Sequence, residues 1–268
     1  MKKILLAFDG TQFSQGAFEF ARRLHEAAPI LLTGAFLPQV DFSAAWSYIA
    51  GDGPLNIPTV EPATSEKVAA NILQFESLCK ANNIDFRTHK HFHNLALAEL
   101  RKETRFADLL VLGCESFFGG HTGYLTDMLH DAECPTVVVP EQFRFPEQLV
   151  LAYDGSASSV FAIRQFACVL PELCRLPATL VYAGGETAAP IPDEDYITEL
   201  AARHFSDLEI MNLELPANGE FASWLNRMPA ALLVAGAFGR SLFSQAFHES
   251  FAGEVVDRYA TPVFIAHK

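Results

Sequence analysis

A pair of glycines in the stretch GAFGRSLFSQAFHES, residues 236–250, has the setting of a phosphate-binding loop. The stretch follows the apolar run AALLVA, which predicts a buried strand. Glycine lets the backbone approach a phosphate closely, and the N-terminus of a following helix favours an anion. Gly236 and Gly239 are therefore candidate phosphate-binding residues, and the alternative is a strand-to-helix turn without a ligand.

A second candidate feature is an aspartate that ends a strand-like run in two places, in FDGT and in YDGS. The phosphatase pattern Asp-x-Asp-Gly-Thr would need a nucleophile two residues before Asp9 and Asp154, where this chain has Ala7 and Ala152. A Walker-type loop is excluded as well, because the sequence contains neither Gly-Lys-Ser nor Gly-Lys-Thr. The two aspartates can therefore either help to bind a ligand or simply cap the helix that follows.

Three histidines, His89, His91 and His93, alternate in the run RTHKHFH. Alternate side chains of a strand share one face, which is a geometry that zinc ligands use. Because no paired cysteine or carboxylate motif accompanies them, a polar strand end is preferred over a metal site. Cys114 is interpreted as a small buried residue, with a redox-sensitive thiol as the alternative.

The segments that carry these residues occur twice in the chain. ILLAFDGTQFS at 4–14 returns as LVLAYDGSASS at 149–159, ADLLVLG at 107–113 returns as AALLVAG at 230–236, and CPTVVVP at 134–140 returns as TPVFIAH at 261–267. Three matches in the same order indicate a duplication. We therefore predict two tandem domains, 1–142 and 146–268, joined by the polar, proline-flanked segment PEQFRFPEQ.

Each half is predicted to alternate strands and helices. In the first half the strands are ILLAF, ILLTGAF, IDFRTHKHF, LLVLG and TVVVP, and the helices are a segment beginning near Phe13 and residues 65–81, 94–105 and 123–132. Thr11 or Ser14, and Ser156 or Ser159 in the second half, are suitable helix N-caps. Continuously apolar strands between helices indicate a parallel sheet covered on both faces. The predicted fold class is α/β, with two tandem doubly wound, Rossmann-like domains that each contain a five-stranded, mainly parallel sheet.

Composition and charge exclude several classes of protein. Half of the 268 residues are apolar and 19% are charged, which argues against disorder. A net charge of −13 makes general nucleic-acid binding unfavourable, because phosphate contacts need clustered lysine and arginine. No run reaches the roughly 18 apolar residues of a membrane span, and the five cysteines form no CxxC pair. We therefore expect a cytoplasmic protein with reduced thiols and no membrane partner.

The tandem arrangement, the pattern A[FY]DG[ST]xxS, and LLVxG followed by a proline and an apolar run resemble the universal stress protein family over essentially the whole chain. The resemblance implies the five-stranded parallel fold in each half. Some members of the family bind ATP through a G-x2-G-x9-G-[ST] loop after the fourth strand. Backbone N–H groups and the hydroxyl of that loop hold the phosphates, and the aspartate after the first strand helps to hold the adenosine end.

In the second half the resemblance implies an ATP site, with magnesium. Its residues would be Asp154, Gly155, Ala183, Gly236, Ala237, Gly239, Arg240, Ser250 and Phe251. The third glycine of the pattern is replaced by Glu249. A glutamate costs about 1 kcal/mol where φ is positive, and its carboxylate would repel phosphates. An adenine nucleotide and an altered or empty cleft are both open interpretations.

In the first half Gly113 matches the pattern, but Ser116 stands at the second glycine and the loop is shorter. Asp9, Gly113 and Ser116 therefore mark a degenerate site that is not expected to bind ATP in the family's way.

These observations predict a universal-stress-type regulatory or interaction protein of the stress response. The alternatives are a tandem scaffold that binds a protein or another small ligand without a nucleotide and, least favoured, a slow ATPase. Enzyme activity is not expected, because no general base, nucleophile or metal constellation emerges from the sequence. The resemblance also implies that TVVVP and PVFIAH pair as the edge strands of an intramolecular pseudo-dimer, with further homodimerisation left open.

Overall fold

The structure, a computed structural model, describes residues 1–8, 12–37, 62–90, 96–114, 128–183, 190–213, 220–236 and 261–266. Its strands are β1 (Lys2–Phe8), β2 (Ile30–Phe36), β3 (Asp85–Lys90), β4 (Leu109–Gly113), β5 (Thr136–Val139), β6 (Gln148–Tyr153), β7 (Ala178–Ala183), β8 (Leu208–Leu213), β9 (Ala231–Gly236) and β10 (Val263–Ala266). Its helices are α1 (Gln15–Ala27), α3 (Pro62–Ala81), α4 (Ala96–Thr104), α6 (Ala157–Val169), α7 (Glu194–His204) and α8 (Glu220–Leu225), with a 3-10 turn η2 (Leu173–Arg175). Residues 128–131, within the helix predicted at 123–132, are also helical.

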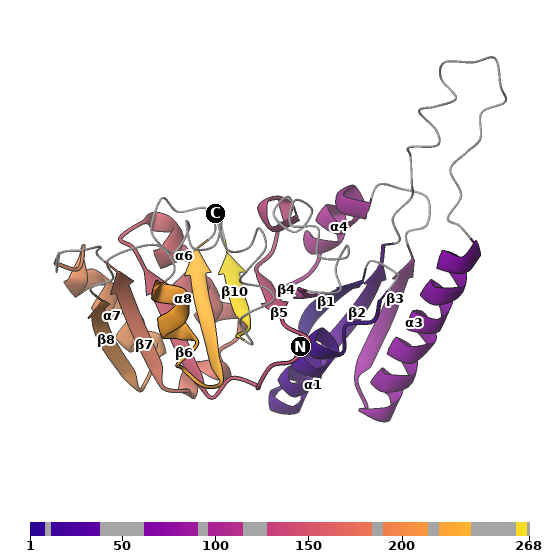
Figure 1. The fold of residues 1–268 in the computed structure, drawn as a ribbon, viewed down its shortest axis with the longest axis horizontal. Coiled ribbons are helices and arrows are strands. Elements are labelled where there is room, and N and C mark those ends of the chain that lie inside the picture. The colour runs from indigo at the N-terminus through magenta and orange to yellow at the C-terminus, as the bar shows by residue number, and fades with distance from the viewer. Residues whose placement is uncertain are drawn as a thin grey trace, which may run out of the picture.

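The ten strands of the described residues form one twisted sheet in the order β3-β2-β1-β4-β5-β10-β9-β6-β7-β8 (Figure 1). Read outward from the centre, β5-β4-β1-β2-β3 of the first half matches β10-β9-β6-β7-β8 of the second half. The strand order therefore repeats the duplication seen in the sequence. Neighbouring strands within each half are parallel, which confirms the predicted α/β class.

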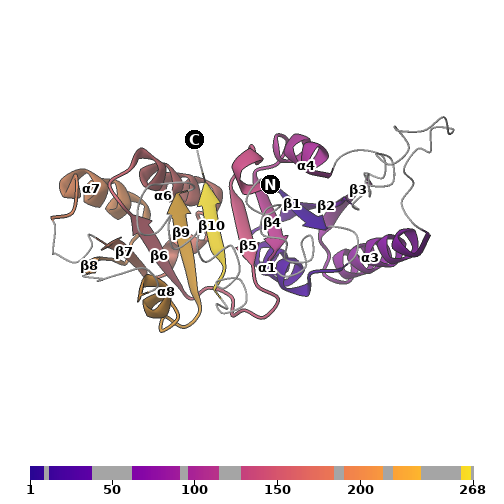
Figure 2. The same cartoon turned by 45° about the horizontal axis from the view of Figure 1, so that its top comes forward.

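The two halves are joined edge to edge by β5 and β10, the antiparallel pair at the centre of the sheet (Figure 2). Val138 pairs with Val263 and Val137 with Phe264. This is the pairing that the sequence predicts for TVVVP and PVFIAH. It joins the two predicted five-stranded sheets into one sheet and covers backbone groups that would otherwise be exposed at two apolar edges.

Apolar side chains fill both faces of the sheet, because parallel strands are buried on both sides. On one face Ile4, Leu6, Leu149 and Leu151 pack with residues of α1, α3, α6 and α7 in a continuous core. On the other face the alternate strand residues pack under α4, residues 128–132 and α8. Both cores contain residues from each half, so the sheet and its cover are continuous across the centre.

Serine caps begin the two helices that follow the first strand of each half. Ser14 is the N-cap of α1 and accepts a hydrogen bond from the Ala17 N–H at 3.2 Å. Ser156 is the N-cap of α6 and accepts from the Ser159 N–H at 3.2 Å. Two of the predicted caps are thus confirmed, and they occupy different positions of the repeat, so α6 begins about one turn earlier than α1.

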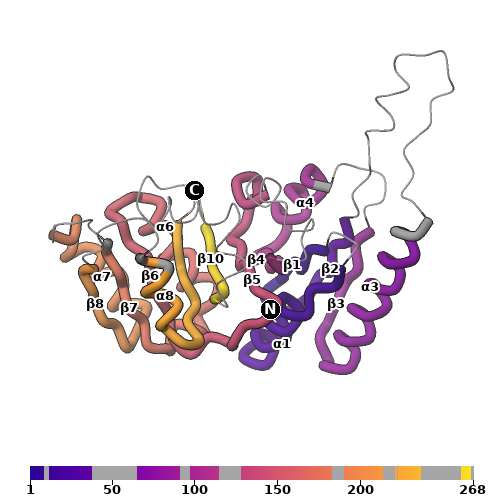
Figure 3. The backbone as a smooth tube through the Cα atoms, in the orientation of Figure 1, coloured from indigo at the N-terminus to yellow at the C-terminus, as the bar shows by residue number. Residues whose placement is uncertain are grey.

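Two further contacts hold the halves together. Lys2 of β1 forms an ion pair with Glu172, which precedes η2. The connection between β5 and β6 runs beside α1 (Figure 3). There Phe143 and Phe145 pack against Phe20 with tilted rings, whose centroids lie 5.9 and 5.5 Å from that of Phe20. The connection is therefore part of the packed structure.

Phe264 offers a test of the central strand pair. Its side chain is fully buried, and its ring meets Phe166 of α6 edge-on at 5.1 Å. We expect Phe264→Ala to lower the free energy of unfolding by about 3–5 kcal/mol, because a large cavity opens beside the pair. Urea denaturation measures the loss, and Phe106→Ala, at a phenylalanine that is 63% exposed, is the control with little expected change. Equal losses in the two variants would contradict this account of the pair.

Candidate functional site

The carboxyl ends of β6 and β9 meet at the point where the strand order of the second half reverses. From β6 the chain moves outward to β7, whereas β9 lies on the other side of β6. The register Leu151–Val234 places Asp154 and Gly236 at the same edge of the sheet. In open α/β sheets such a reversal leaves a crevice where ligands bind. The structure therefore brings together these two predicted site residues.

A tight turn fixes Asp154 at this edge. One carboxylate oxygen, Oδ1, accepts a hydrogen bond from the Ser156 N–H at 2.9 Å. Gly155 has a φ of 77°, and a side chain there would meet Pro192 at 2.9 Å. Glycine is thus needed at 155 both for its backbone conformation and for space. The aspartate therefore holds the turn that leads into α6, but it does not cap the helix, because Ser156 is the N-cap.

Gly236 is required by the close approach of α6. A Cβ atom at this position would lie 2.6 Å from the Ser158 carbonyl carbon and 2.7 Å from its oxygen. Backbone atoms cannot give way as a flexible side chain can, so the first turn of α6 rests directly on the end of β9. The glycine that the sequence assigns to phosphate binding therefore has a packing role that the sequence did not reveal.

Tyr153 closes the side of the edge next to β7. It is buried, and its hydroxyl donates to the carbonyl oxygen of Pro192 at 2.7 Å. Burial, together with the charges of Asp193 and Asp154, raises the pKa of this hydroxyl above its ordinary range. Ala183 ends β7 at the same edge. The turn before α7 thus packs against the end of β6, a contact that the proline at 192 could have suggested.

The rest of the predicted nucleotide site lies outside the described residues: Ala237, Gly239, Arg240, Ser250 and Phe251, and with them Glu249. The same is true of Asp9 and Ser116 in the first half and of His91 and His93. The phosphate loop therefore stays a prediction from the sequence.

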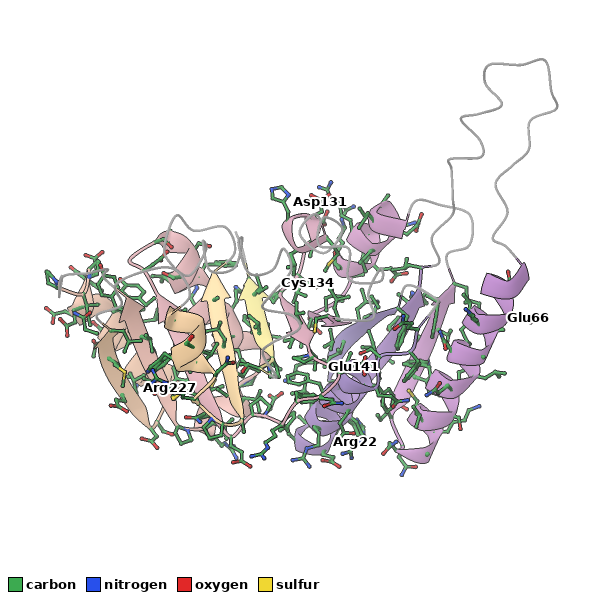
Figure 4. The ribbon with its side chains drawn as sticks, in the orientation of Figure 1. Arg22, Glu66, Asp131, Cys134, Glu141 and Arg227 are labelled. Atoms are coloured by element: carbon green, nitrogen blue, oxygen red, sulfur yellow. The ribbon has the colours of Figure 1, made fainter. Side chains whose placement is uncertain are left out.

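In the first half, the N-terminus of α1 is met by a carboxylate of the chain itself. Glu141, the second residue after β5, accepts a hydrogen bond from the Gly16 N–H through Oε2 at 3.0 Å. A side chain at Gly16 would meet the Pro140 carbonyl oxygen at 2.3 Å, so glycine is needed for this approach. Figure 4 labels Glu141 in the first half, near α1. The carboxylate neutralises the positive end of the helix, where an external anion could otherwise bind.

Gly113, the other described residue of the predicted degenerate site, ends β4 beside Val139. Cys114 follows it, is buried, and donates its N–H to the Val139 carbonyl at 3.1 Å. Burial raises the pKa of three other thiols, of Cys79 and Cys134 to about 12 and of Cys174 to about 11. These thiols are protonated at neutral pH and therefore weak nucleophiles.

His89 of β3 is bound by a residue of α4. Its Nδ1 lies 2.7 Å from Oε1 of Glu103. Within the part of the chain that the structure describes, no group of three or more histidine, cysteine, aspartate or glutamate side chains could hold a metal ion. None of the helices in the described part of the chain is long and apolar enough to cross a membrane.

Comparisons with known proteins agree with this fold. No protein-family profile matches the sequence, and no curated protein matches it. A universal stress protein from Archaeoglobus fulgidus superimposes with a TM-score of 0.68 at 15% identity, over 99% of this chain and 98% of the other. A candidate universal stress protein from Pseudomonas aeruginosa gives 0.53 at 15% identity, over 100% of this chain and 93% of the other. A protein of unknown function from that species also gives 0.53, at 13% identity over 100% and 92%. The chain thus has the fold of universal stress proteins over its whole length.

Glu141 provides a test of the carboxylate contact with the N-terminus of α1. We expect Glu141→Ala to lower the free energy of unfolding by about 1–2 kcal/mol, because it removes a charge-assisted hydrogen bond at the helix end. Glu141→Gln keeps an acceptor and should lose less. Glu147→Ala, at an exposed side chain of the same connection, is the matched control. Urea denaturation that gives Glu147→Ala the same loss as Glu141→Ala would refute the assigned role.

Tyr153 provides a test by titration. Because its pKa is raised, its contribution to stability is present below about pH 10 and is lost as the pH rises through the folded-state pKa. We expect a pH titration of ultraviolet absorbance to show one more tyrosine in the wild type than in Tyr153→Phe, and this tyrosine should ionise above the ordinary pH range. In concentrated urea the midpoint of the same absorbance difference should move to about pH 10. A folded-state difference already centred at about pH 10 would show that the site does not protect this hydroxyl.

Proposed function

We propose that this chain is a universal-stress-type regulatory protein that acts in a stress response through its interactions, with an adenine-nucleotide site in its second half. The observation that carries the proposal is the meeting of Asp154 and Gly236 at the β6–β9 reversal, against the first turn of α6. The backbone there is held at the place where a nucleotide binds in folds of this kind. The relatives named above as universal stress proteins support the fold on which this rests.

The two halves are proposed to differ in function. In the second half, the sequence supplies Gly239, Arg240 and Ser250 at the spacing that suits phosphates. In the first half, the Glu141 carboxylate already meets the N-terminus of α1, and Ser116 replaces a glycine of the pattern. The first half then serves the pseudo-dimer as a packing partner, while the second half responds to the nucleotide.

A scaffold that binds a protein or another small ligand without a nucleotide is the second candidate. The hydrogen bond from the Ser156 N–H to Asp154 favours it, because the turn gives this carboxylate a structural role of its own. Glu249 favours it too, since a carboxylate at the third glycine position would face the phosphates. A slow ATPase is the least favoured of the three.

Nucleotide binding is tested on the full chain by acid extraction and by calorimetric titration with Mg-ATP. We expect saturable binding that Asp154→Asn weakens by about tenfold, and that Glu249→Gly tightens by at least tenfold because a repulsive charge is removed. Asp108→Asn, on the connection before β4, is the control with unchanged affinity. Absence of nucleotide in the extract together with no heat of binding, in the wild type and in Glu249→Gly, would exclude the nucleotide site and leave the scaffold.

A further inference from the structure

A groove of about 570 Å³ runs between α6 and α7 on the outside of the second half. It is lined mainly by apolar and aromatic side chains, among them Val160, Phe161, Tyr196, Ile197 and Leu200. This size and this lining are typical of sites for small organic molecules. Figures 1 and 2 both show the two helices side by side at the end of the sheet away from the first half.

The groove has two chemically different ends. Because α6 and α7 follow the parallel strands β6 and β7 and contribute to the same core, they run in the same direction. Gly155 and Asp193 lie where the helices begin, and Arg164 lies two turns further along α6. From Ala157 to Arg164 the helix rises by about 10 Å. The groove therefore has a carboxylate at one end and a guanidinium about two helical turns away.

Among the residues that the structure describes, no ion pair neutralises either charge. Arg164 is exposed, its guanidinium lies 5.8 Å from the Phe161 ring, and none of the described carboxylates forms an ion pair with it. Asp193 stands at the N-cap position of α7 with φ 48° and ψ 39°, yet its side chain makes no capping hydrogen bond. A residue in this left-handed conformation that also leaves the helix uncapped is unfavourable for the fold alone.

Tyr196 gives the groove an aromatic wall that packing does not require. Its side chain is 77% exposed, although its neighbour Ile197 is buried. Phe161 of α6 is half-buried and also lines the groove. Two rings from two helices can hold a planar ring by stacking or edge contacts, and the Arg164 guanidinium next to one of them suits an anionic group on that ring.

We propose that the α6–α7 groove binds a small aromatic carboxylate, with its ring between Phe161 and Tyr196 and its carboxylate at Arg164. Asp193 disfavours a second negative charge at the other end, so a polyphosphate does not suit this groove. At its Asp193 end the groove shares Tyr153 and Gly155 with the β6 edge of the proposed nucleotide site. Phe161, Arg164 and Tyr196, which carry this proposal, are not among the residues of that site.

The test uses 2-naphthoate as the probe and 2-naphthamide, the same ring without the charge, as its match. Ligand-observed NMR titration of the full chain should give saturable binding of naphthoate with a dissociation constant of the order of 1 mM. Naphthamide should bind about threefold to fivefold more weakly, the strength expected of an exposed charge pair.

Three variants assign the binding to the groove. Arg164→Gln should weaken naphthoate about threefold to fivefold and leave naphthamide unchanged. Asp193→Asn should tighten naphthoate by up to about threefold, the opposite direction, because a repulsive charge is lost. Tyr196→Ala should weaken both probes about threefold to tenfold.

Arg203→Gln, at an exposed arginine of α7 outside the groove, is the matched control and should change neither probe. Since Arg164, Asp193 and Tyr196 are exposed, these variants should keep the far-ultraviolet circular dichroism of the wild type. The proposal is overturned if naphthoate does not saturate, if it binds no better than naphthamide, or if Arg203→Gln weakens it as much as Arg164→Gln does.

Discussion

The antiparallel pairing of β5 with β10 is the interaction on which the rest of the structure depends. Each of these strands is short, apolar and buried, and each would form the inner edge of its own five-stranded sheet. An edge of this kind exposes unpaired backbone groups beside hydrophobic side chains and invites association. Pairing the two edges within one chain gives the backbone groups of both edges hydrogen-bond partners. It also joins the cores of the two halves on each face of the sheet.

This pairing also constrains the connection between the halves. β5 and β10 run in opposite directions. The segment from β5 to β6 links the last strand of the first half to the first strand of the second half. It does so by packing Phe143 and Phe145 against α1 and placing Glu141 at the N-terminus of that helix. A segment that looks like a polar linker in the sequence thus becomes part of the core, and one of its acids changes the chemistry of the first half's sheet edge.

The sequence predicts the fold well, because its signals are local and occur twice. The repeated strands and the serine caps follow from apolar runs and capping residues, and the structure confirms them. The pairing of TVVVP with PVFIAH, which the family resemblance implies for two apolar edge strands, is also present. The site was harder to predict, because its details depend on contacts between distant segments. Two of these contacts place Pro192 against Gly155 and Ser158 against Gly236. No sequence pattern links the residues of either pair. A glycine needed for packing looks the same in a sequence as a glycine needed for a phosphate.

The two halves differ most at one position of the repeat. When the two halves are aligned so that Ser14 matches Ser159, Gly16 is equivalent to Phe161. At Gly16 the missing side chain lets the backbone of residues 140–141 come against α1, and Glu141 then occupies the helix end. A phenylalanine cannot permit that approach, and at Phe161 the ring instead forms one wall of the groove beside α7. Since the strand order around both positions is the same, this single difference in side-chain volume goes with a carboxylate against the helix end in one half and a groove beside α7 in the other. The duplicated fold therefore offers two unlike surfaces.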